Sequence, residues 1–310
     1  MKNNRRILVT GASSPLGSGV VKALLKDKKF ITRVLVTNAG GEDALIWKEM
    51  GAEIAEGKLD HAGSLMKAME DCYGVFGLTD YWEQPASEYQ LGKNLMDSVA
   101  ASHIRHFVFN SADNYSKLSN GSYSVPQCDI KAKLQQYSKA LKLYATFLQP
   151  SFYFENFLGF AALQMDAAGG YRFGFPQGNT RLAAMSVEDY GEIVRTVFNY
   201  PIEYIGRTVR TVGSDNTCAE YAAILSEVLG EKIEFVHIPR EEYAALDFPG
   251  AEALANLFEV QRLYIPQRQI DLIESYGLNP VMQHFRNWVI KNKPYFMEHI
   301  HSLNQAKAVA

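Results

Sequence analysis

Near the N-terminus a glycine-rich turn suits the binding of a phosphate: its sequence is Thr10-Gly-Ala-Ser-Ser-Pro-Leu-Gly17. The turn follows the apolar run Ile7–Val9 directly. A short strand, a glycine-rich turn and a helix start together form a common cradle for a nucleotide pyrophosphate. Gly11 suits a tight turn, and Gly17 lets the helix pack closely on the strand. The sequence therefore predicts a dinucleotide site here, and the alternative is a tight turn without a ligand.

The middle glycine of the usual motif is missing from this turn. One common spacing of the motif places Ser14 at that position, and the other places Pro15 there. A glycine at this point lets the backbone approach the pyrophosphate, so one contact is weakened. Pro15 suits a first helical turn, and Ser14 suits the cap before it. The helix start still offers backbone amides to an anion, and the hydroxyls of Ser13 and Ser14 add donors.

The first half of the chain alternates short β-rich runs with helical patterns, which predicts the framework around this turn. The expected strands are 7–10, 33–37, 53–57, 74–79, 106–111 and 145–150, and the helical segments include 17–26, 41–50, 64–69 and 88–102. Such alternation is typical of an α/β fold with a Rossmann-type, doubly wound parallel sheet. Ligands bind such a sheet at the carboxyl ends of its strands, where the strand order reverses.

Beyond Pro150 the regular alternation fades, which predicts a smaller α+β C-terminal lobe. We expect a nucleotide-binding domain over 1–150, with part of 182–214 added to its sheet, and a lobe over 151–310 that covers the cleft. Turns are expected around 169–177, and a capping box at 217–220 predicts a helix that ends at Gly230. Breaks between the last helices are predicted at Pro249, Pro266, Pro280 and Pro294.

Composition excludes several classes of function. The formal net charge is −3 for 310 residues, so no basic excess supports direct binding to nucleic acid. The three cysteines are widely spaced and form no Cys-x-x-Cys pair, which argues against a disulfide framework or a zinc site and predicts no metal. No segment approaches the roughly 18 apolar residues of a membrane span. The sequence predicts a cytoplasmic protein that does not bind membranes.

Five further segments follow the turn in a recognisable order: 51–83, 152–158, 183–191, 248–259 and 278–280. Together with the turn, they resemble the NmrA-like family of atypical short-chain dehydrogenases. Within that family the likeness is greatest to the NADPH-sensing redox-sensor group. The resemblance spans Ile7 to about Ile290. It implies a Rossmann domain with a small C-terminal lobe.

The resemblance implies a set of cofactor-binding residues. They are Gly11, Ala12, Ser13, Ser14, Pro15, Leu16, Gly17, Asn38, Lys58, Leu59, Asp60, Thr79, Asp80, Tyr81, Lys131, Phe152, Tyr153, Glu155 and Asn156. Asn38 stands where NADP-binding members usually carry an arginine for the 2′-phosphate, and no aspartate for an NAD ribose stands there either. Lys58 replaces an acid of the family pattern. The resemblance implies NADP(H), NAD(H) stays open, and the amides of 38–41 could form an anion nest.

The position of the usual Tyr-x-x-x-Lys pair, again by resemblance, holds Gln127 and Lys131. Glutamine neither gives up nor accepts a proton at neutral pH, so Lys131 is left to hold ribose hydroxyls. A literal match at Tyr89 and Lys93 lies on a different predicted helix, and we interpret it as a coincidence. For an enzyme, the candidate catalytic residues are Lys131, Ser111, Tyr81 and Tyr153.

The aromatic stretch 152–156 has two interpretations that the sequence leaves open. It resembles the family segment that borders the nicotinamide, and the polar pair Glu155-Asn156 among aromatic residues suits a cleft lining. Alternatively, the aromatic rings form an apolar contact between the lobes. Asp189 is interpreted as a residue of a helix start rather than a ligand contact.

Three functional hypotheses follow. The first is a regulator that binds NAD(P)(H), changes shape or oligomeric state, and is sensed by another protein; the regulatory role comes from the resemblance alone. The second is an NAD(P)H-dependent reductase of a quinone, imine or enone that needs no protein proton donor. The third is a scaffold that binds no nucleotide. The predicted partners are a nicotinamide dinucleotide and either a regulatory protein or a small aromatic or quinone substrate, and a homodimer stays open.

Overall fold

The chain folds into two compact units, each with its own core. The computed structural model describes residues 4–166, 169–265 and 267–309. Within this part, the first unit comprises 4–114, 126–150 and 187–211, and the second comprises 115–125, 151–186 and 212–309. The chain therefore passes from one unit to the other several times, and one of these crossings is the bond between Ser186 and Val187.

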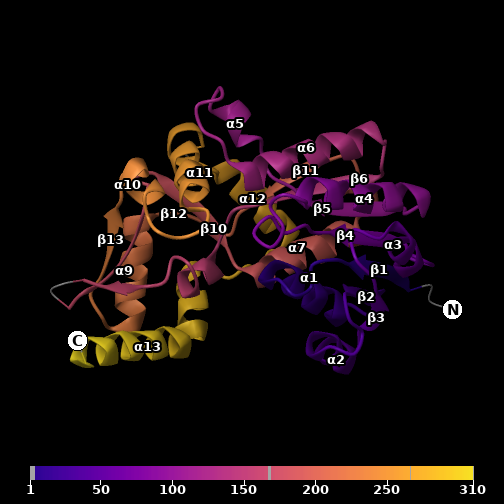
Figure 1. The fold of residues 1–310 in the computed structure, drawn as a ribbon. Helices are drawn as coiled ribbons and strands as arrows, with labels where there is room; N and C mark the ends of the chain where they lie inside the picture. The colour runs from indigo at the N-terminus through magenta and orange to yellow at the C-terminus, as the bar shows by residue number, and fades with distance from the viewer. Residues whose placement is uncertain (1–3, 167–168, 266, 310) are drawn as a thin grey trace. The chain divides into compact units, whose positions relative to one another are not determined.

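A seven-stranded sheet forms the centre of the first unit (Figure 1). Its order is β11 (Thr208–Thr211), β6 (Ala145–Pro150), β5 (His106–Asn110), β4 (Gly74–Gly77), β1 (Arg5–Val9), β2 (Phe30–Val36) and β3 (Glu53–Glu56). All the pairings are parallel. The order reverses between β1 and β4, which is where ligands bind in open α/β sheets. The Rossmann-type, doubly wound fold predicted from the sequence is confirmed.

Helices cover both faces of this sheet. One face carries α3 (Ala62–Ala68), α4 (Glu88–Ala101) and α6 (Pro126–Ala140), whose apolar residues share a buried cluster with the strands. On the other face α1 (Pro15–Lys26) packs against α7 (Val187–Asn199), and α2 (Glu42–Glu49) follows β2. Successive residues of a strand point to opposite faces of the sheet. Val75 of β4 belongs to the buried cluster shared with α3, α4 and α6, whereas the ring of Phe76 packs against that of Tyr190 on α7, with centroids 6.2 Å apart.

The contact between α1 and α7 is made by their backbones. A Cβ added to Gly19 would collide with the carbonyl oxygen of Val187, and one added to Gly191 would collide with the carbonyl oxygen of Gly19. Both glycines are therefore needed for the two helices to approach so closely. This contact sets α7 against the helix that begins at the glycine-rich turn.

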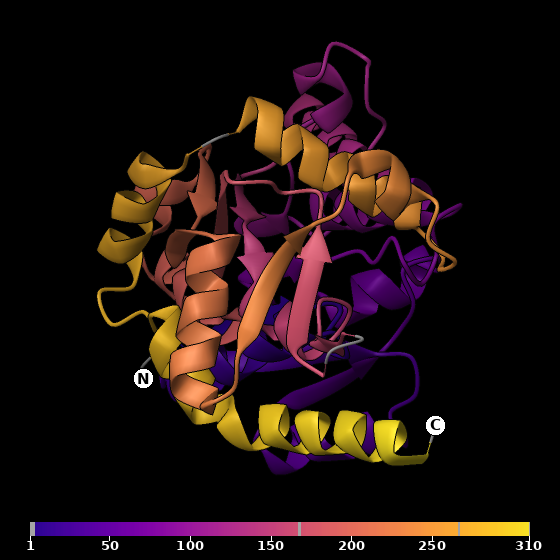
Figure 2. The same cartoon turned by 90° about the vertical axis from the view of Figure 1, so that its left-hand side faces the viewer.

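The second unit contains two small sheets with helices around them. One sheet has the order β12 (Ser214–Thr217), β10 (Arg181–Met185) and β7 (Phe152–Tyr153), and the other has the order β13 (Ile233–His237), β9 (Tyr171–Phe175) and β8 (Gln164–Met165). The helices are α5 (Tyr115–Leu118), the 3₁₀ turn η1 (Phe154–Leu158), α9 (Cys218–Leu229), α10 (Arg240–Ala244), α11 (Ala251–Tyr264), α12 (Gln269–Leu278) and α13 (Phe285–Val309). Figure 2 shows β9 and β13 side by side, with α9 next to β13. The predicted α+β character is confirmed.

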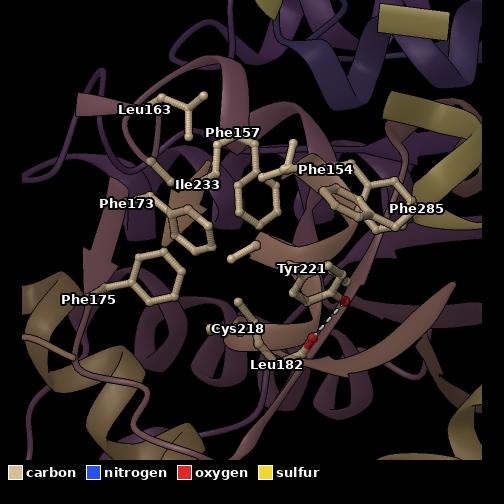
Figure 3. Close-up of a cluster of buried hydrophobic side chains, with 14 of the residues drawn as sticks. Phe154, Phe157, Leu163, Phe173, Phe175, Leu182, Cys218, Tyr221, Ile233 and Phe285 are labelled. Carbon is tan, nitrogen blue, oxygen red and sulfur yellow. Dashed lines mark hydrogen bonds between the residues drawn. The ribbon is translucent and has the colours of Figure 1, made fainter. Parts of the chain in front are cut away.

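Aromatic rings fill the core of the second unit (Figure 3). Phe157 packs against Phe173, Tyr221 and Phe285 with ring centroids 5.1–5.6 Å apart. The hydroxyl of Tyr221 donates to the carbonyl of Leu182 at 2.9 Å, so its polar end is satisfied inside the core. Burial raises the pKa of Tyr221 well above its usual value. Each aromatic contact of this kind is worth about 0.5–1.5 kcal/mol beyond the area it buries.

Three predictions for the second unit can be compared with its elements. The capping box of α9 is present, and Gly230 closes that helix in the left-handed conformation, as predicted. The turns predicted around 169–177 are wrong in part, because 171–175 form strand β9. Pro249 and Pro280 lie between helices as predicted, and Pro266 lies outside the described residues.

The break predicted at Pro294 is wrong, because α13 continues through it. Proline removes one helical hydrogen bond and crowds the preceding turn. Two side chains on either side of it, Trp288 and Phe296, are nevertheless buried in the aromatic core. Tertiary packing of both halves of the helix therefore outweighs the local cost of the proline.

A buried histidine stands at the start of β5. Nε2 of His106 lies 2.9 Å from the hydroxyl of Thr146, which itself donates to Tyr204 O at 2.7 Å. Nε2–H is therefore the donor, and Nδ1 carries no proton. Within the described part of the chain Nδ1 has no partner. Burial lowers the pKa of His106 from 6.5 to about 3, and the charge of Arg5 adds to this effect.

We expect this histidine to make the protein less stable as the pH falls below 6.5. Its folded-state pKa lies below its unfolded value, so the unfolded chain binds the extra proton. Its contribution is complete above pH 6.5 and is lost progressively towards pH 3. The loss is about 1.4 kcal/mol per pH unit, or about 2 kcal/mol at about pH 5. Urea unfolding of the wild type and of His106→Gln at a series of pH values measures this slope.

In His106→Gln the dependence of the unfolding free energy on pH should be smaller by about one proton in this range. His103→Gln is the control, because it removes an exposed histidine and should keep the wild-type slope. Equal slopes in the wild type and His106→Gln would show that His106 accepts a proton in the folded protein.

Candidate functional site

The glycine-rich turn is tied to the strand beside it. Thr10 follows β1, and its hydroxyl oxygen accepts a hydrogen bond from Leu78 N at 2.9 Å. The same hydroxyl donates to Leu78 O at 3.1 Å. Leu78 is the residue that follows β4, so this side chain links the ends of the two strands at which the sheet order reverses. The turn is therefore fixed at the position where the fold binds ligands.

Both outer glycines are required by the shape of the turn. Gly11 has a φ of +69°, and a Cβ added to it would lie 2.9 Å from Leu78 Cδ2. A Cβ added to Gly17 would collide with the carbonyl oxygen of Gly11. Side chains at these positions would open the turn. The two glycines thus have the geometric roles expected of a dinucleotide cradle.

Ser14 caps helix α1. Its Oγ accepts from Gly17 N at 3.1 Å and donates to Gly11 O at 2.8 Å, so this hydroxyl is engaged within the turn. Pro15 begins the helix and has no N–H. The amides of Leu16 and Gly17 are therefore first-turn donors that no intrahelical carbonyl can satisfy, and the Ser14 hydroxyl accepts from that of Gly17. Ser13 is exposed, whereas the side chains of Ala12 and Leu16 are buried.

The loop after β2 differs from the anion nest suggested by its sequence. Gly40 N donates to Asn38 Oδ1 at 2.9 Å, and Gly41 N donates to Asn38 O at 3.1 Å. Ala39 N donates to a carboxylate oxygen of Glu56, also at 2.9 Å. These three amides are therefore used within the protein, and the nest prediction is wrong. Glu56, which the sequence analysis did not single out, adds a negative charge beside Asn38.

The segment after β3 has its backbone held by α3 and α4. Lys58 N donates to Ser64 Oγ at 3.2 Å, and Leu59 O accepts from Asn94 Nδ2 at 3.1 Å. The side chains of Lys58 and Asp60 are exposed. Both are therefore accessible to a ligand, and their predicted contact with a cofactor stays a prediction.

The segment after β4 is compact. Asp80 Oδ1 accepts from Trp82 N at 2.8 Å, which closes a short turn. The rings of Tyr81 and Trp82 meet edge to face with centroids 5.3 Å apart. Trp82 is 50% exposed and Tyr81 is half-buried, so aromatic surface stands at the end of this strand.

Lys131 extends from α6 into a buried polar cluster. Its Nζ forms an ion pair with Glu88 Oε1, and it donates to Thr79 O at 2.8 Å and to Thr79 Oγ1 at 3.3 Å. The Thr79 hydroxyl donates to the same oxygen of Glu88 at 2.7 Å. The side chain of Glu88 is fully buried, and that of Lys131 is 13% exposed. Both partners of this ion pair are largely removed from water, unlike those of a flexible ion pair on the protein surface.

Glu88 was missed by the sequence analysis. It lies 43 residues from Lys131, in the first turn of α4, where an acid is usually explained by the helix dipole. Its second oxygen, Oε2, is buried and has no partner within the described residues. Thr79, Glu88 and Lys131 therefore form one unit, which we call the Glu88 cluster.

Ser111, another candidate for proton transfer, is engaged within the first unit. Ser111 follows β5, is buried, and donates to Gln135 Oε1 at 2.6 Å. Gln135 donates in turn to the hydroxyl of Thr208 on β11, at 2.8 Å. The literal Tyr89 to Lys93 match lies on α4, where the Lys93 ammonium sits 4.9 Å from the ring centre of Tyr137.

The aromatic stretch after β6 belongs to the second unit. Phe152 is buried, and its ring contacts those of Phe157, Phe160, Phe175 and Phe258. A carboxylate oxygen of Glu155 accepts from the indole N–H of Trp288 at 3.1 Å. Tyr153 and Asn156 are half-buried. The cofactor contacts expected of these residues stay predictions.

Within the first unit, the structure brings together the turn at 11–17, the end of β4 and Lys131. The link runs from Thr10 to Leu78 and from Thr79 to Lys131. Among the described residues, no three histidine, cysteine or acidic side chains are grouped so that they could hold a metal ion. No helix in the same part of the chain has the length and apolar character needed to cross a membrane.

Comparisons with known proteins add two findings. The sequence profile of the NmrA-like family matches residues 3–282. The NmrA-like family domain-containing oxidoreductase hkm9 of Aspergillus hancockii is 30% identical over 270 residues, which are 81% of this chain and 80% of that protein.

Two solved structures share the fold. NmrA, described as a negative transcriptional regulator, was solved with NADP and with NAD; it has a TM-score of 0.81 at 18% identity and covers 94% of this chain and 96% of its own. The triphenylmethane reductase of Citrobacter sp., solved with NADP(H), has a TM-score of 0.76 at 18% identity and covers 93% of this chain and 99% of its own. At these identities the similarity shows the fold.

Proposed function

The chain belongs to the NmrA-like family, as its motifs predicted, and from that membership we propose that it binds a nicotinamide dinucleotide and acts as a nucleotide-dependent regulator. The proposed site is the glycine-rich turn with the ends of β1 and β4. NmrA, a regulator of the same fold, was solved with NADP and with NAD. This similarity supports a dinucleotide as the ligand.

The geometry of the turn fits a pyrophosphate. Gly11 and Gly17 let the turn close tightly against Leu78 and on itself, and the amide of Leu16 lies in the first turn of a twelve-residue helix. The positive end of the helix dipole favours a bound anion there. Bound in its reduced form, the nucleotide would supply a hydride. The residues of this chain would hold the pyrophosphate and, at the end of β4, the half of the ligand that carries the nicotinamide.

One observation favours a regulator over a dehydrogenase that transfers protons through a tyrosine. Lys131 is paired with the carboxylate of Glu88, and the preceding turn of its helix carries Gln127 instead of a tyrosine. An amide side chain cannot act as a general acid or base. The lysine therefore has a buried carboxylate as its partner, and residue 127 supplies no proton. Binding without turnover is the behaviour this arrangement supports best.

Calorimetric titration of the full chain with NADPH, NADP, NADH and NAD tests this proposal. Binding of at least one nucleotide with a dissociation constant in the micromolar range, together with a change in hydrogen exchange or oligomeric state, is the expected result. Absence of binding by all four would leave the scaffold hypothesis.

A reductase is the second candidate, because the relative from Aspergillus hancockii is named an oxidoreductase. The exposed ring of Trp82 and its neighbour Tyr81 give an aromatic surface at the end of β4 that suits a flat acceptor. A quinone or cationic imine needs no protein proton donor before hydride transfer. NADPH oxidation well above background with such acceptors would favour this function over the regulator.

Cofactor preference can be tested at Asn38. The neutral side chain and the nearby carboxylate of Glu56 predict a preference for NADPH over NADH of less than about tenfold, or about 1.4 kcal/mol. Asn38→Arg should raise NADPH affinity selectively, because a guanidinium can bind the 2′-phosphate with two hydrogen bonds. Titration of both proteins with NADPH and NADH measures the change.

The control is Lys48→Arg, which adds a guanidinium to an exposed position near the end of α2 without changing the charge. It should leave both affinities unchanged. A wild-type preference of about a hundredfold or more for NADPH would contradict the prediction and point to another basic residue, with the exposed Lys58 as the first to change.

A further inference from the structure

The ammonium of Lys131 has no donor left for a ligand. A lysine ammonium carries three N–H donors. In this structure it meets three acceptors: the backbone oxygen of Thr79, the hydroxyl of Thr79, and Glu88 Oε1. All belong to the first unit. A ribose hydroxyl can therefore bind Lys131 only in exchange for one of these contacts.

Glu88 holds this arrangement in place from inside the protein. Its side chain is fully buried, so water does not screen its attraction for the ammonium. The Thr79 hydroxyl donates to the same carboxylate oxygen, so the segment after β4 is also held by Glu88. The charge of Glu88 also cancels that of Lys131, which reduces the attraction of this end of β4 for the phosphates of a nucleotide.

We propose that Glu88 is a positioning residue that restrains Lys131, so that the ammonium can bind a nucleotide only after it leaves one of its protein acceptors. The affinity test of this inference rests on the proposed nucleotide binding. The restraint itself acts on a lysine side chain and can be measured without nucleotide.

Glu88→Gln is the informative substitution because of the unpartnered oxygen. The bonds from Lys131 and Thr79 both reach Oε1, and Oε2 has no partner among the described residues. A glutamine can keep an oxygen at the first position and place its amide nitrogen at the second. The change therefore removes the charge with little change of shape. Glu88→Asp is a second variant, because it keeps the charge and moves the carboxylate away by one methylene group.

In the first experiment, wild type and variants are titrated with NADPH and NADH. Glu88→Gln should bind about three- to tenfold more tightly, since an ammonium is released next to an anionic ligand. The gain should be absent when Lys131→Met is added. Glu83→Gln is the matched control, because it removes an exposed carboxylate before the same helix and should change nothing. Unchanged or weaker binding by Glu88→Gln, with normal binding by the wild type, would overturn the inference and leave the proposed function standing.

The second experiment uses no nucleotide. Lysines of the full chain are methylated reductively, and the rate at Lys131 is measured by mass spectrometry relative to that at the exposed Lys133. In the wild type Lys131 should react slowly, and in Glu88→Gln several times faster. If neither protein binds nucleotide, the proposed function fails, and the methylation rate alone then tests whether Glu88 restrains Lys131. Equal rates at Lys131 in the wild type and in Glu88→Gln would overturn the inference.

Discussion

Replacement of Lys131 by methionine is expected to lower the free energy of unfolding by about 3–5 kcal/mol. The change leaves the carboxylate of Glu88 fully buried without its cation. Within the described Glu88 cluster, the hydroxyl of Thr79 is then the donor that remains to this carboxylate. An uncompensated charge in the interior is among the most destabilising results of a single substitution. Urea unfolding near pH 7 measures the loss.

The double variant Glu88→Gln with Lys131→Met should recover most of this loss, because a neutral amide replaces the unpaired charge. Lys133→Met is the control on the same helix, since its side chain is exposed and should change stability by less than about 0.5 kcal/mol. A loss below about 1 kcal/mol for Lys131→Met would show that Glu88 finds another partner or a proton in the folded protein.

Alanine at position 17 should weaken nucleotide binding by about a hundredfold. The added Cβ would collide with the carbonyl of Gly11, so the turn would have to open. Opening separates Ser14 from Gly11 and Gly17, to which its hydroxyl is bonded. Overpacking of this kind costs up to about 3 kcal/mol, which corresponds to a loss of affinity of about a hundredfold. Calorimetric titration with the better nucleotide measures it.

Gly277→Ala is the matched control, because a Cβ at this helical position meets no atom within 4 Å. It should leave affinity unchanged and raise stability slightly, since alanine favours a helix. Circular dichroism establishes whether Gly17→Ala is folded. Retention of affinity within about tenfold by a folded Gly17→Ala would mean that the nucleotide does not bind at this turn.

The first unit was largely predictable because its strands carry a strong local signal. Runs such as 106–110 are fully buried, and each is followed by a helix, so alternation alone predicts a parallel sheet. The turn at 11–17 was predictable for the same reason, since its glycines have roles in the turn itself. The Glu88 cluster was not predictable, because its acid and base lie 43 residues apart and meet only through the packing of α4 on α6.

In the second unit, local signals conflicted with packing. Gly170 and Gly174 suggested turns around β9. In the sheet, a Cβ on Gly174 would lie 2.7 Å from Val236 O, so glycine is required by the neighbouring strand β13. Phe152 illustrates the same limit: the sequence left two interpretations open, and its ring lies among four phenylalanines brought in from segments as distant as α11.

The close contact between α1 and α7 has a mechanical consequence. Where side chains separate two helices, a small displacement of one is absorbed by rotamer changes. Gly19 and Gly191 leave backbone against backbone, so we expect a displacement of α1 to be transmitted directly to α7. The glycine-rich turn stands at the head of α1, and Val187, which touches Gly19, is the residue at which the chain crosses from the second unit into the first. A displacement of the glycine-rich turn would therefore be passed through α1 and α7 to the point where the chain enters the first unit.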